Sequence, residues 1–244
     1  MPGFENAVKL AKENKTLGVG IHLNIVRGKP VSKPEEVSSL LNKNGNFLTI
    51  YPFVRKFILG KIEVEQIEKE FRAQIEKVFD EGIEITHFDS EKHVHSIPKI
   101  MRVVIKFAKE YKIPKIRFIN EFCISFDVIR SLKTMVVSCL NRKMKRSILK
   151  AGILIPDRFY GICGSGRMNS KNLIKILTSI PEGVTEIMMH PGIIDEDYRK
   201  IEQEYGPYYL KEERERELEA LIDLKVREII EGENIQLINY RDLN

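Results

Sequence analysis

Short apolar runs alternate with segments of helical pattern along nearly the whole chain, and this alternation restricts the possible folds more than any other feature. The apolar runs have the length of strands, and the segments between them carry apolar residues every three or four positions. Strands that alternate with helices usually pair in parallel through helical crossovers. We therefore expect an α/β protein of mostly parallel strands, with its functional residues at the carboxyl ends of those strands.

The boundaries of these elements follow from the apolar pattern and from the turn residues. The expected strands are Leu17–Leu23, Ile83–Asp89, Lys115–Ile119, Arg158–Ile162, Thr185–His190 and Ile235–Asn239. The expected helices are Phe4–Glu13, Tyr51–Gly60, Val64–Phe79, Ile97–Tyr111, Phe126–Lys150, a helix from Asn169 or Ser170 to Ser179, and one or two helices within Leu210–Glu231. A long loop with one short helix is expected over residues 27–50. No internal repeat or linker interrupts the pattern, so we predict a single domain over residues 1–244.

The composition is that of an ordinary globular chain, and 244 residues are enough to bury a full core. No apolar run is long enough to span a membrane and the N-terminus lacks a signal-peptide pattern, so we predict a soluble, cytoplasmic protein. The cysteines Cys123, Cys139 and Cys163 are odd in number and lack ligand-like spacing, which argues against a disulfide framework or a cysteine zinc site. The net charge of +5 permits an anionic ligand and does not require nucleic acid.

The five histidines of the chain all fall at or just beyond the end of an expected strand. His22, His87 and His190 lie in the last positions of three strands, while His93 and His95 follow in the loop after one of them. Because the carboxyl ends of parallel strands share one rim of the fold, we expect all five imidazoles at that rim.

Two carboxylates, Asp89 and Glu91, lie among these histidines in the segment Thr86–His95. Imidazoles and carboxylates are ligands for zinc, and carboxylates also suit magnesium. A bound divalent ion lowers the pKa of its water toward about 7, and a nearby histidine can transfer protons. Since no nucleophilic cysteine or G-x-S-x-G turn is present, the residues favour metal-assisted hydrolysis over acyl-enzyme chemistry.

Structural alternatives exist for each of these features. His87 can be a hydrogen-bonded structural residue, Asp89 can cap a turn, and Glu91 with Lys92 can be an exposed charged pair. The turn Gly164-Ser165-Gly166 lacks the lysine of a phosphate-binding P-loop, so a plain turn is expected there. The basic residues of the helix over 126–150 can bind an anion, but a solvated helix face is the favoured interpretation: Arg142, Lys143, Lys145 and Arg146.

Several motifs together resemble the YdjC-like carbohydrate deacetylases, which include chito-oligosaccharide deacetylases and relatives linked to hopanoid biosynthesis. The motifs are Gly20-Ile21-His22-Leu23-Asn24, Gly28-Lys29-Pro30, Thr86–His95 and Met189-His190-Pro191-Gly192. The resemblance implies a (β/α) barrel distorted from the eight-fold form, a bound divalent metal (Mg²⁺ or Zn²⁺), and hydrolysis of the N-acetyl group of an acetylated amino sugar or oligosaccharide.

The same resemblance implies roles for individual residues. His22 and Glu91 would be metal ligands; the better-known members have His where Glu91 stands, and a Glu favours a harder ion. His190 would give a proton to the leaving amine, and Asp89 is the second residue expected in catalysis. The residues expected to orient ligands or contact the sugar are His93, His95 and Arg117.

One departure from the family pattern concerns the start of the chain. The family opens with an apolar strand that ends in Asn-Ala-Asp-Asp-Phe-Gly, whose Asp is a metal ligand, and this sequence begins after that segment. The resemblance therefore predicts a barrel incomplete at the N-terminus, a marginal monomer or a homodimer, weak metal binding and low activity. Two other interpretations stay open: a carbohydrate-binding relative without catalysis and, less favoured, a nucleic-acid binder through the helix over 126–150.

Overall fold

The computed structural model describes residues 3–122, 127–196, 198–199 and 211–244. Over these residues the chain is a mixed α/β protein with short parallel strands. In chain order the elements are α1 (Phe4–Glu13), β1 (Val19–Leu23), the 3₁₀ segment η1 (Pro34–Leu40), α2 (Ile50–Ile58), α3 (Val64–Phe79), β2 (Ile85–Ser90), the 3₁₀ segment η2 (Glu91–Ser96), α4 (Pro98–Glu110), α5 (Val128–Lys150), β3 (Arg158–Tyr160), α6 (Ser170–Leu177), β4 (Thr185–Ile187), α8 (Lys211–Ile222) and α9 (Leu224–Gly232).

The chain divides into two compact units, and each is described by itself. The first unit comprises residues 1–117, 140–155 and 239–244, and the second comprises residues 118–139 and 156–238. The boundary between the units falls within α5. The expected organisation as a single domain stays a prediction.

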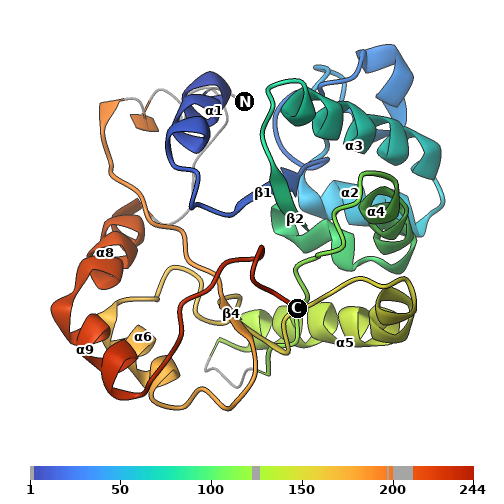
Figure 1. Cartoon of the computed structure of the whole chain (residues 1–244). Helices are drawn as coiled ribbons and strands as arrows, with labels where there is room; N and C mark the ends of the chain where they lie inside the picture. Colours follow the sequence, from blue (N-terminus) through green and yellow to red (C-terminus); the bar gives the residue numbers. More distant parts are fainter. Residues whose placement is uncertain (1–2, 123–126, 197, 200–210) are drawn as a thin grey trace. The chain divides into compact units, whose positions relative to one another are not determined.

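In the first unit, β1 and β2 pair in parallel, and α3 packs beside β1 and α4 (Figure 1). The side chains of Ile21, Leu23 and Phe88 are buried on one face of this pair. Gly20 and His22 alternate with them and therefore belong to the opposite face. The sequence alone predicted both strands and the α3 helix, whose apolar positions Ile67, Phe71 and Ile75 are buried in the structure.

The strand expected over Lys115–Ile119 is present only as isolated pairings. The backbone N–H of Phe88 donates to the carbonyl of Lys115, and the N–H of Arg117 donates to the carbonyl of Phe88. Ile116 in turn donates to the carbonyl of Leu154, a pairing that the sequence did not predict. This segment therefore makes one parallel bridge to β2, between Ile116 and Phe88, and one to Leu154, from Lys115, and it does not form a regular strand.

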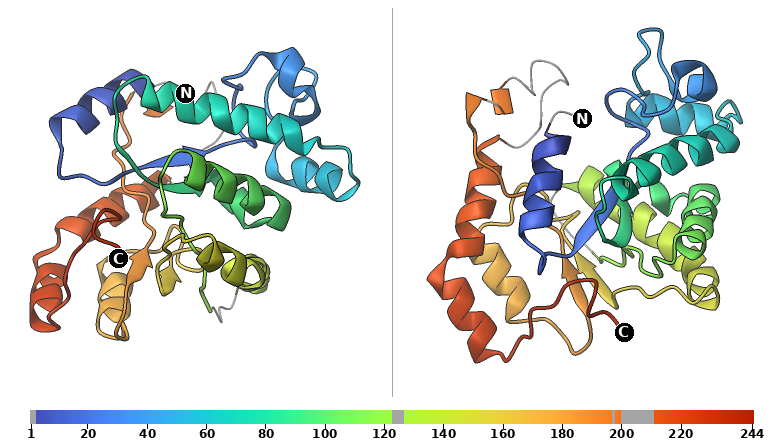
Figure 2. Two further views of the ribbon diagram at one scale, coloured as in Figure 1. Left: turned by 45° about the vertical axis from the view of Figure 1, so that its right-hand side comes forward. Right: turned by 45° about the horizontal axis from the view of Figure 1, so that its top comes forward.

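In the second unit, β3 and β4 pair in parallel over Arg158–Tyr160 and Thr185–Ile187. One cluster of its core joins Phe159, Ile162 and Met188, and another lies where α6, α8 and α9 pack together (Figure 2). The single or double helix expected near the C-terminus is two helices, because Asp223 caps α9 by accepting the N–H of Lys225 at 2.9 Å. The described residues thus form two two-stranded parallel sheets, and a closed barrel stays a prediction.

The prediction of a strand over Ile235–Asn239 is wrong, since this segment has no regular secondary structure. Leu237 is 74% exposed, so the apolar residues there do not mark a buried strand. At its end the chain turns: the Asn239 side chain accepts the N–H of Arg241, and Asp242 accepts the N–H of Asn239. An apolar run this short has no periodicity by which a buried strand can be distinguished from an extended segment on the surface.

The structure also bears on the expectations about membrane-spanning segments and about the cysteines. No helix in the described part of the chain is long and apolar enough to cross a membrane. Cys163 forms a disulfide bond while Cys139 is free and exposed, so the argument against a disulfide framework did not foresee the bond of Cys163. The starts of the helices expected at Phe126 and Leu210 lie outside the described residues.

Candidate functional site

The candidate site of the first unit lies at the carboxyl ends of β1 and β2. The register pairs Gly20 with His87 and His22 with Asp89, which puts these four residues on one face of the strand pair. At the end of β2 the chain enters η2 at once, and Glu91 is its first residue. The local sequence thus brings three functional side chains from two strand ends to one place.

His22 bridges two carboxylates. Its Nδ1 lies 2.8 Å from Oδ1 of Asp89, and its Nε2 lies 3.2 Å from Oε2 of Glu91. The imidazole is 50% exposed, whereas Asp89 is buried. With both nitrogens protonated, the ring donates one hydrogen bond to each carboxylate.

The charges of this arrangement shift all three pKa values. Burial opposes the charged form of His22, but the hydrogen bonds and charges of Asp89 and Glu91 outweigh it and raise the pKa of His22 to about 9. Burial likewise opposes ionisation of Glu91, yet His22 and Arg27 lower its pKa to about 2. The pKa of Asp89 is lowered in the same way, against burial, by His22 and Arg117. At neutral pH the three groups are therefore an imidazolium between two carboxylates.

Two arginines complete what we call the His22 cluster: His22, Asp89, Glu91, Arg27 and Arg117. Nη1 of Arg117 donates to Oδ2 of Asp89 at 2.5 Å, and both side chains are nearly buried. Nη2 of Arg27 lies 3.2 Å from Oε1 of Glu91. Each carboxylate of the cluster therefore has a guanidinium on one oxygen and His22 on the other, which fixes the orientation of both carboxylates.

His87 lies on the same face and is held by contacts on both sides of its ring. The ring stacks on Tyr240 with centroids 3.7 Å apart, and a Cβ atom on Gly20 would lie only 2.3 Å from it. Its Nδ1 is 3.0 Å from the hydroxyl of Thr86. Burial lowers the pKa of His87 to about 4, so the ring is neutral at pH 7. These contacts match the structural role that the sequence left open for His87.

His95 is fully buried and supports the cluster from behind. Its Nδ1 accepts the hydroxyl of Ser90 at 2.5 Å, and its Nε2 lies 3.2 Å from the carbonyl oxygen of Arg117. Burial lowers its pKa to about 4, so it is neutral. His93, half-buried in a left-handed backbone conformation (φ 57°), meets His95 edge to face at 6.4 Å between centroids. His95 therefore fixes the backbone that carries Arg117.

The cluster contains two side chains suitable for one divalent ion. Nε2 of His22 and Oε2 of Glu91 are 3.2 Å apart, close to the separation of about 3 Å that follows from metal–ligand bonds of about 2.1 Å. Asp89 on Nδ1 is the carboxylate that typically orients a metal-bound histidine. Over the described residues no group of three or more His, Cys, Asp or Glu side chains could hold a metal. The imidazole of His22 suits Zn²⁺ and the carboxylate of Glu91 suits Zn²⁺ or Mg²⁺, so the pair could hold a divalent ion whose other positions water would fill.

His190 belongs to the second unit, and its proximity to the His22 cluster stays a prediction. There its backbone N–H donates to Oε2 of Glu217 at 2.5 Å, while Oε1 of the same buried carboxylate accepts the N–H of Gly166 at 3.1 Å. A second buried carboxylate, Glu121, accepts the backbone N–H groups of Gly161, Ile162 and Cys163. Two glutamates thus organise the loops of this unit, including the loop that carries His190.

The sequence indicated some of these residues and missed others. The strand-end rule brought His22, Asp89 and Glu91 to one place, as the structure has them. Sequence reasoning missed Arg27, Tyr240, Glu121 and Glu217, which act through contacts with distant segments. For Arg27 the only signal was its position directly before the Gly28-Lys29-Pro30 motif.

A family model described as YdjC-like protein matches residues 1–232. The chain belongs to the YdjC-like family. A carbohydrate deacetylase from Clostridium beijerinckii is 35% identical to this YdjC-like chain over 244 residues, covering 100% of the chain and 85% of the relative. A carbohydrate deacetylase from Thermoanaerobacter pseudethanolicus is 33% identical over 240 residues, covering 98% and 83%.

A solved structure also resembles this YdjC-like chain. It is described as a candidate cellobiose-phosphate cleavage protein from Enterococcus faecalis V583 and superposes with a TM-score of 0.75 at 26% identity. The similarity covers 98% of this chain and 83% of that one. The likeness extends over both units and supports the mixed α/β architecture.

Proposed function

We propose that this protein is a carbohydrate deacetylase, which hydrolyses the N-acetyl group of an acetylated amino sugar or oligosaccharide with the help of a divalent metal ion. The observation that carries the proposal is the bridge of His22 between Asp89 and Glu91 at adjacent strand ends. Support for the type of reaction comes from membership of the YdjC-like family, whose similar relatives are named carbohydrate deacetylases.

The reaction is the hydrolysis of an amide. The oxygen of a water molecule bonds to the carbonyl carbon of the acetyl group, the carbon–nitrogen bond breaks, and the nitrogen takes up a proton, so that acetate and a free amine result. His22 and Glu91 would hold the ion; the imidazole nitrogen favours Zn²⁺, whereas the carboxylate suits Zn²⁺ and Mg²⁺. When bound, the ion lowers the pKa of a water molecule toward about 7 and polarises the carbonyl oxygen.

Asp89 and His190 are the residues that we propose for catalysis: Asp89 orients the metal-binding ring of His22, and His190 donates a proton. Asp89 accepts from Nδ1 of His22, so it sets the ring orientation and leaves Nε2 for the ligand position. His190 is proposed as the donor of the proton that the leaving amine takes up. An imidazole is a common proton donor in enzymes, and Glu217 fixes the backbone of His190 by accepting its N–H.

Substrate contacts are proposed for His93 and Arg117, with His95 in support. The Arg117 side chain is 13% exposed and pairs with Asp89, and a guanidinium has further N–H groups that could donate to sugar hydroxyls. His95 is fully buried, so its proposed part is to hold the backbone of Arg117 in place. We also propose a barrel architecture, a cytoplasmic location and a homodimer for this deacetylase.

The test is acetate release from di-N-acetylchitobiose by the purified chain, with Mg²⁺, with Zn²⁺ and after treatment with a chelator. Acetate release that the chelator abolishes and added metal restores is the expected result. Tight binding of the sugar without acetate release, under every metal condition, would instead identify a carbohydrate-binding relative and contradict the proposed enzyme. Acetate release that withstands complete chelation would overturn the metal dependence alone.

A further inference from the structure

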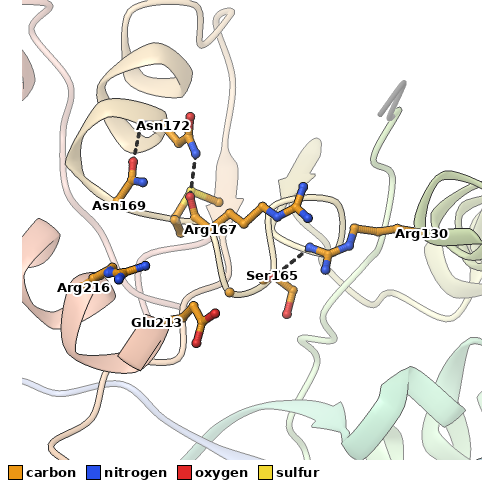
Figure 3. A pocket seen from close by; sticks show the side chains of 9 residues that line it. Arg130, Ser165, Arg167, Asn169, Asn172, Glu213 and Arg216 are labelled. Atoms are coloured by element: carbon orange, nitrogen blue, oxygen red, sulfur yellow. Dashed lines mark hydrogen bonds between the residues drawn. The ribbon is translucent and has the colours of Figure 1, made fainter. Parts of the chain in front are cut away.

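We propose that a pocket in the second unit binds the phosphoryl group of a small phosphorylated molecule or of free phosphate. The pocket has a volume of about 380 Å³ and surrounds the turn at Ser165 (Figure 3). We call it the arginine pocket, because three arginines from separate parts of the sequence line it: Arg130, Arg167 and Arg216. All its lining residues lie in the second unit, so the proposal is independent of the His22 cluster and of the proposed deacetylase activity.

Arg130 is held in a fixed position at this pocket. Its Nη1 donates to the carbonyl oxygens of Ser165 at 2.6 Å and Cys163 at 3.2 Å. Its Nε lies 3.4 Å from Asp127, one turn earlier. Contacts to two carbonyls of the turn restrain the guanidinium, so little conformational entropy remains to be lost when a ligand binds.

Arg167 has the opposite character. Its side chain is exposed, and its guanidinium has no hydrogen-bond or ion-pair partner among the residues that the structure describes. Figure 3 shows this guanidinium pointing toward that of Arg130 above the Ser165 turn. Two like charges that converge repel one another, and an anion between them removes that cost. Planar guanidinium groups also match phosphate oxygens with paired hydrogen bonds.

The turn itself is rigidly built. The N–H of Gly166 donates to the buried carboxylate of Glu217 at 3.1 Å. Asn169 caps α6 by accepting the N–H of Asn172 at 3.1 Å, and the Asn172 side chain donates to the carbonyl of Arg167 at 2.6 Å. The backbone that carries Arg167 is therefore fixed on both sides. The positive end of the α6 dipole faces the same region and adds to its attraction for anions.

The charge of the pocket distinguishes a phosphoryl group from a carboxylate. Glu213 is the acidic residue among the lining residues, and Asp127 beside Arg130 offsets part of the charge from outside them, so the three arginines leave a positive excess. Arg216 also pairs with Glu212 at 3.3 Å, but both side chains are largely exposed and water screens that pair. A phosphate monoester carries nearly two negative charges at neutral pH, which matches this excess better than a carboxylate does.

The experiment is titration calorimetry of the whole chain with inorganic phosphate, glucose 6-phosphate, glucose and acetate. We expect binding of one or both phosphate probes and none of glucose or acetate at the same millimolar concentrations. Tighter binding of glucose 6-phosphate than of phosphate would identify a phosphomonoester as the ligand, and the reverse would identify free phosphate. Failure of both phosphate probes to bind, or equal binding of acetate, would overturn the proposal.

The variant R167Q locates the binding. Arg167 is exposed, so its substitution leaves the fold intact, and the loss of a charge-assisted contact should weaken phosphate binding about tenfold. The matched control is R227Q, which removes an exposed arginine of α9 that pairs only with Glu231 among the described residues. Equal weakening in both variants would show a general effect of charge and contradict a site in the arginine pocket. Acetate release from the neutral sugar should be unchanged in R227Q.

Discussion

The His22 cluster and the arginine pocket both gather charged side chains, but they balance charge in opposite ways. In the cluster, each carboxylate has a guanidinium on one oxygen and His22 on the other, so the charges are paired inside a partly buried network. In the pocket, three arginines face one glutamate, and the positive excess is exposed. The paired charges of the cluster therefore stabilise the folded protein. The positive excess of the pocket contributes little to stability and is better suited to binding an anionic ligand.

The largest effect on stability is expected for Asp89→Ala in the cluster. This change leaves Arg117, only 13% exposed, without its carboxylate, and it removes the partner of His22. Loss of one partner from a buried pair should lower the free energy of unfolding by about 3 kcal/mol. Urea unfolding measures it, with Glu81→Gln, which breaks an exposed pair with Lys12, as the control. Equal midpoints for the two variants would show that the cluster is not a stabilising network.

Gly20→Ala tests the packing beneath the cluster. The added Cβ would lie 2.3 Å from the His87 ring, which Tyr240 confines from the other side. We expect a loss of about 1–3 kcal/mol in the free energy of unfolding from this overpacking. Gly232→Ala at the end of α9, where a Cβ has open space, is the matched control and should be neutral. Unfolding of both variants at the same urea concentration would contradict the close packing of the His87 ring against Gly20 of β1.

Glu121 gives a pH-dependent prediction for the second unit. Burial raises the pKa of the Glu121 carboxyl, although three backbone N–H groups favour its ionised form. A raised folded-state pKa means that its stabilising contribution is fully present below the unfolded pKa of about 4.3 and is lost as the pH rises through the folded pKa. Between pH 4 and 7 the wild type should therefore lose stability relative to Glu121→Gln in thermal unfolding scans. If the thermal stability of the wild type and of Glu121→Gln changed with pH in the same way, the raised pKa of Glu121 would be contradicted.

The smallest effect on stability is expected for Arg167→Gln in the arginine pocket. Its guanidinium has no partner within the described residues, so its removal should change the free energy of unfolding by less than about 0.5 kcal/mol. A slight gain would agree with relief of its repulsion with Arg130. A loss comparable to that of Asp89→Ala would show that the pocket is a structural network like the cluster.

The sequence predicted best where local patterns decide the structure. The boundaries of α3 and the presence of β1 and β2 follow from the apolar pattern, and the strand-end rule led to His22, Asp89 and Glu91. Ile235–Asn239 failed because a short apolar run on the surface has the same composition as a buried strand.

Other features depend on contacts between distant segments, which no local pattern reveals. Tyr240 stacks on His87 from the far end of the chain, and Glu217 is buried because backbone N–H groups of two separate loops bind it. The arginines of the pocket come from α5, the Ser165 turn and α8. From the sequence the turn was interpreted as a plain turn, since its neighbours in space were not visible.

The most direct test of the central claim is acetate release by His22→Gln, compared with the wild type and with Arg227→Gln, at saturating metal. His22 contacts both carboxylates of the cluster, so its loss should reduce acetate release at least about 100-fold while the control keeps wild-type activity. Undiminished acetate release by a folded His22→Gln protein would contradict the assignment of the His22 cluster as the reaction centre.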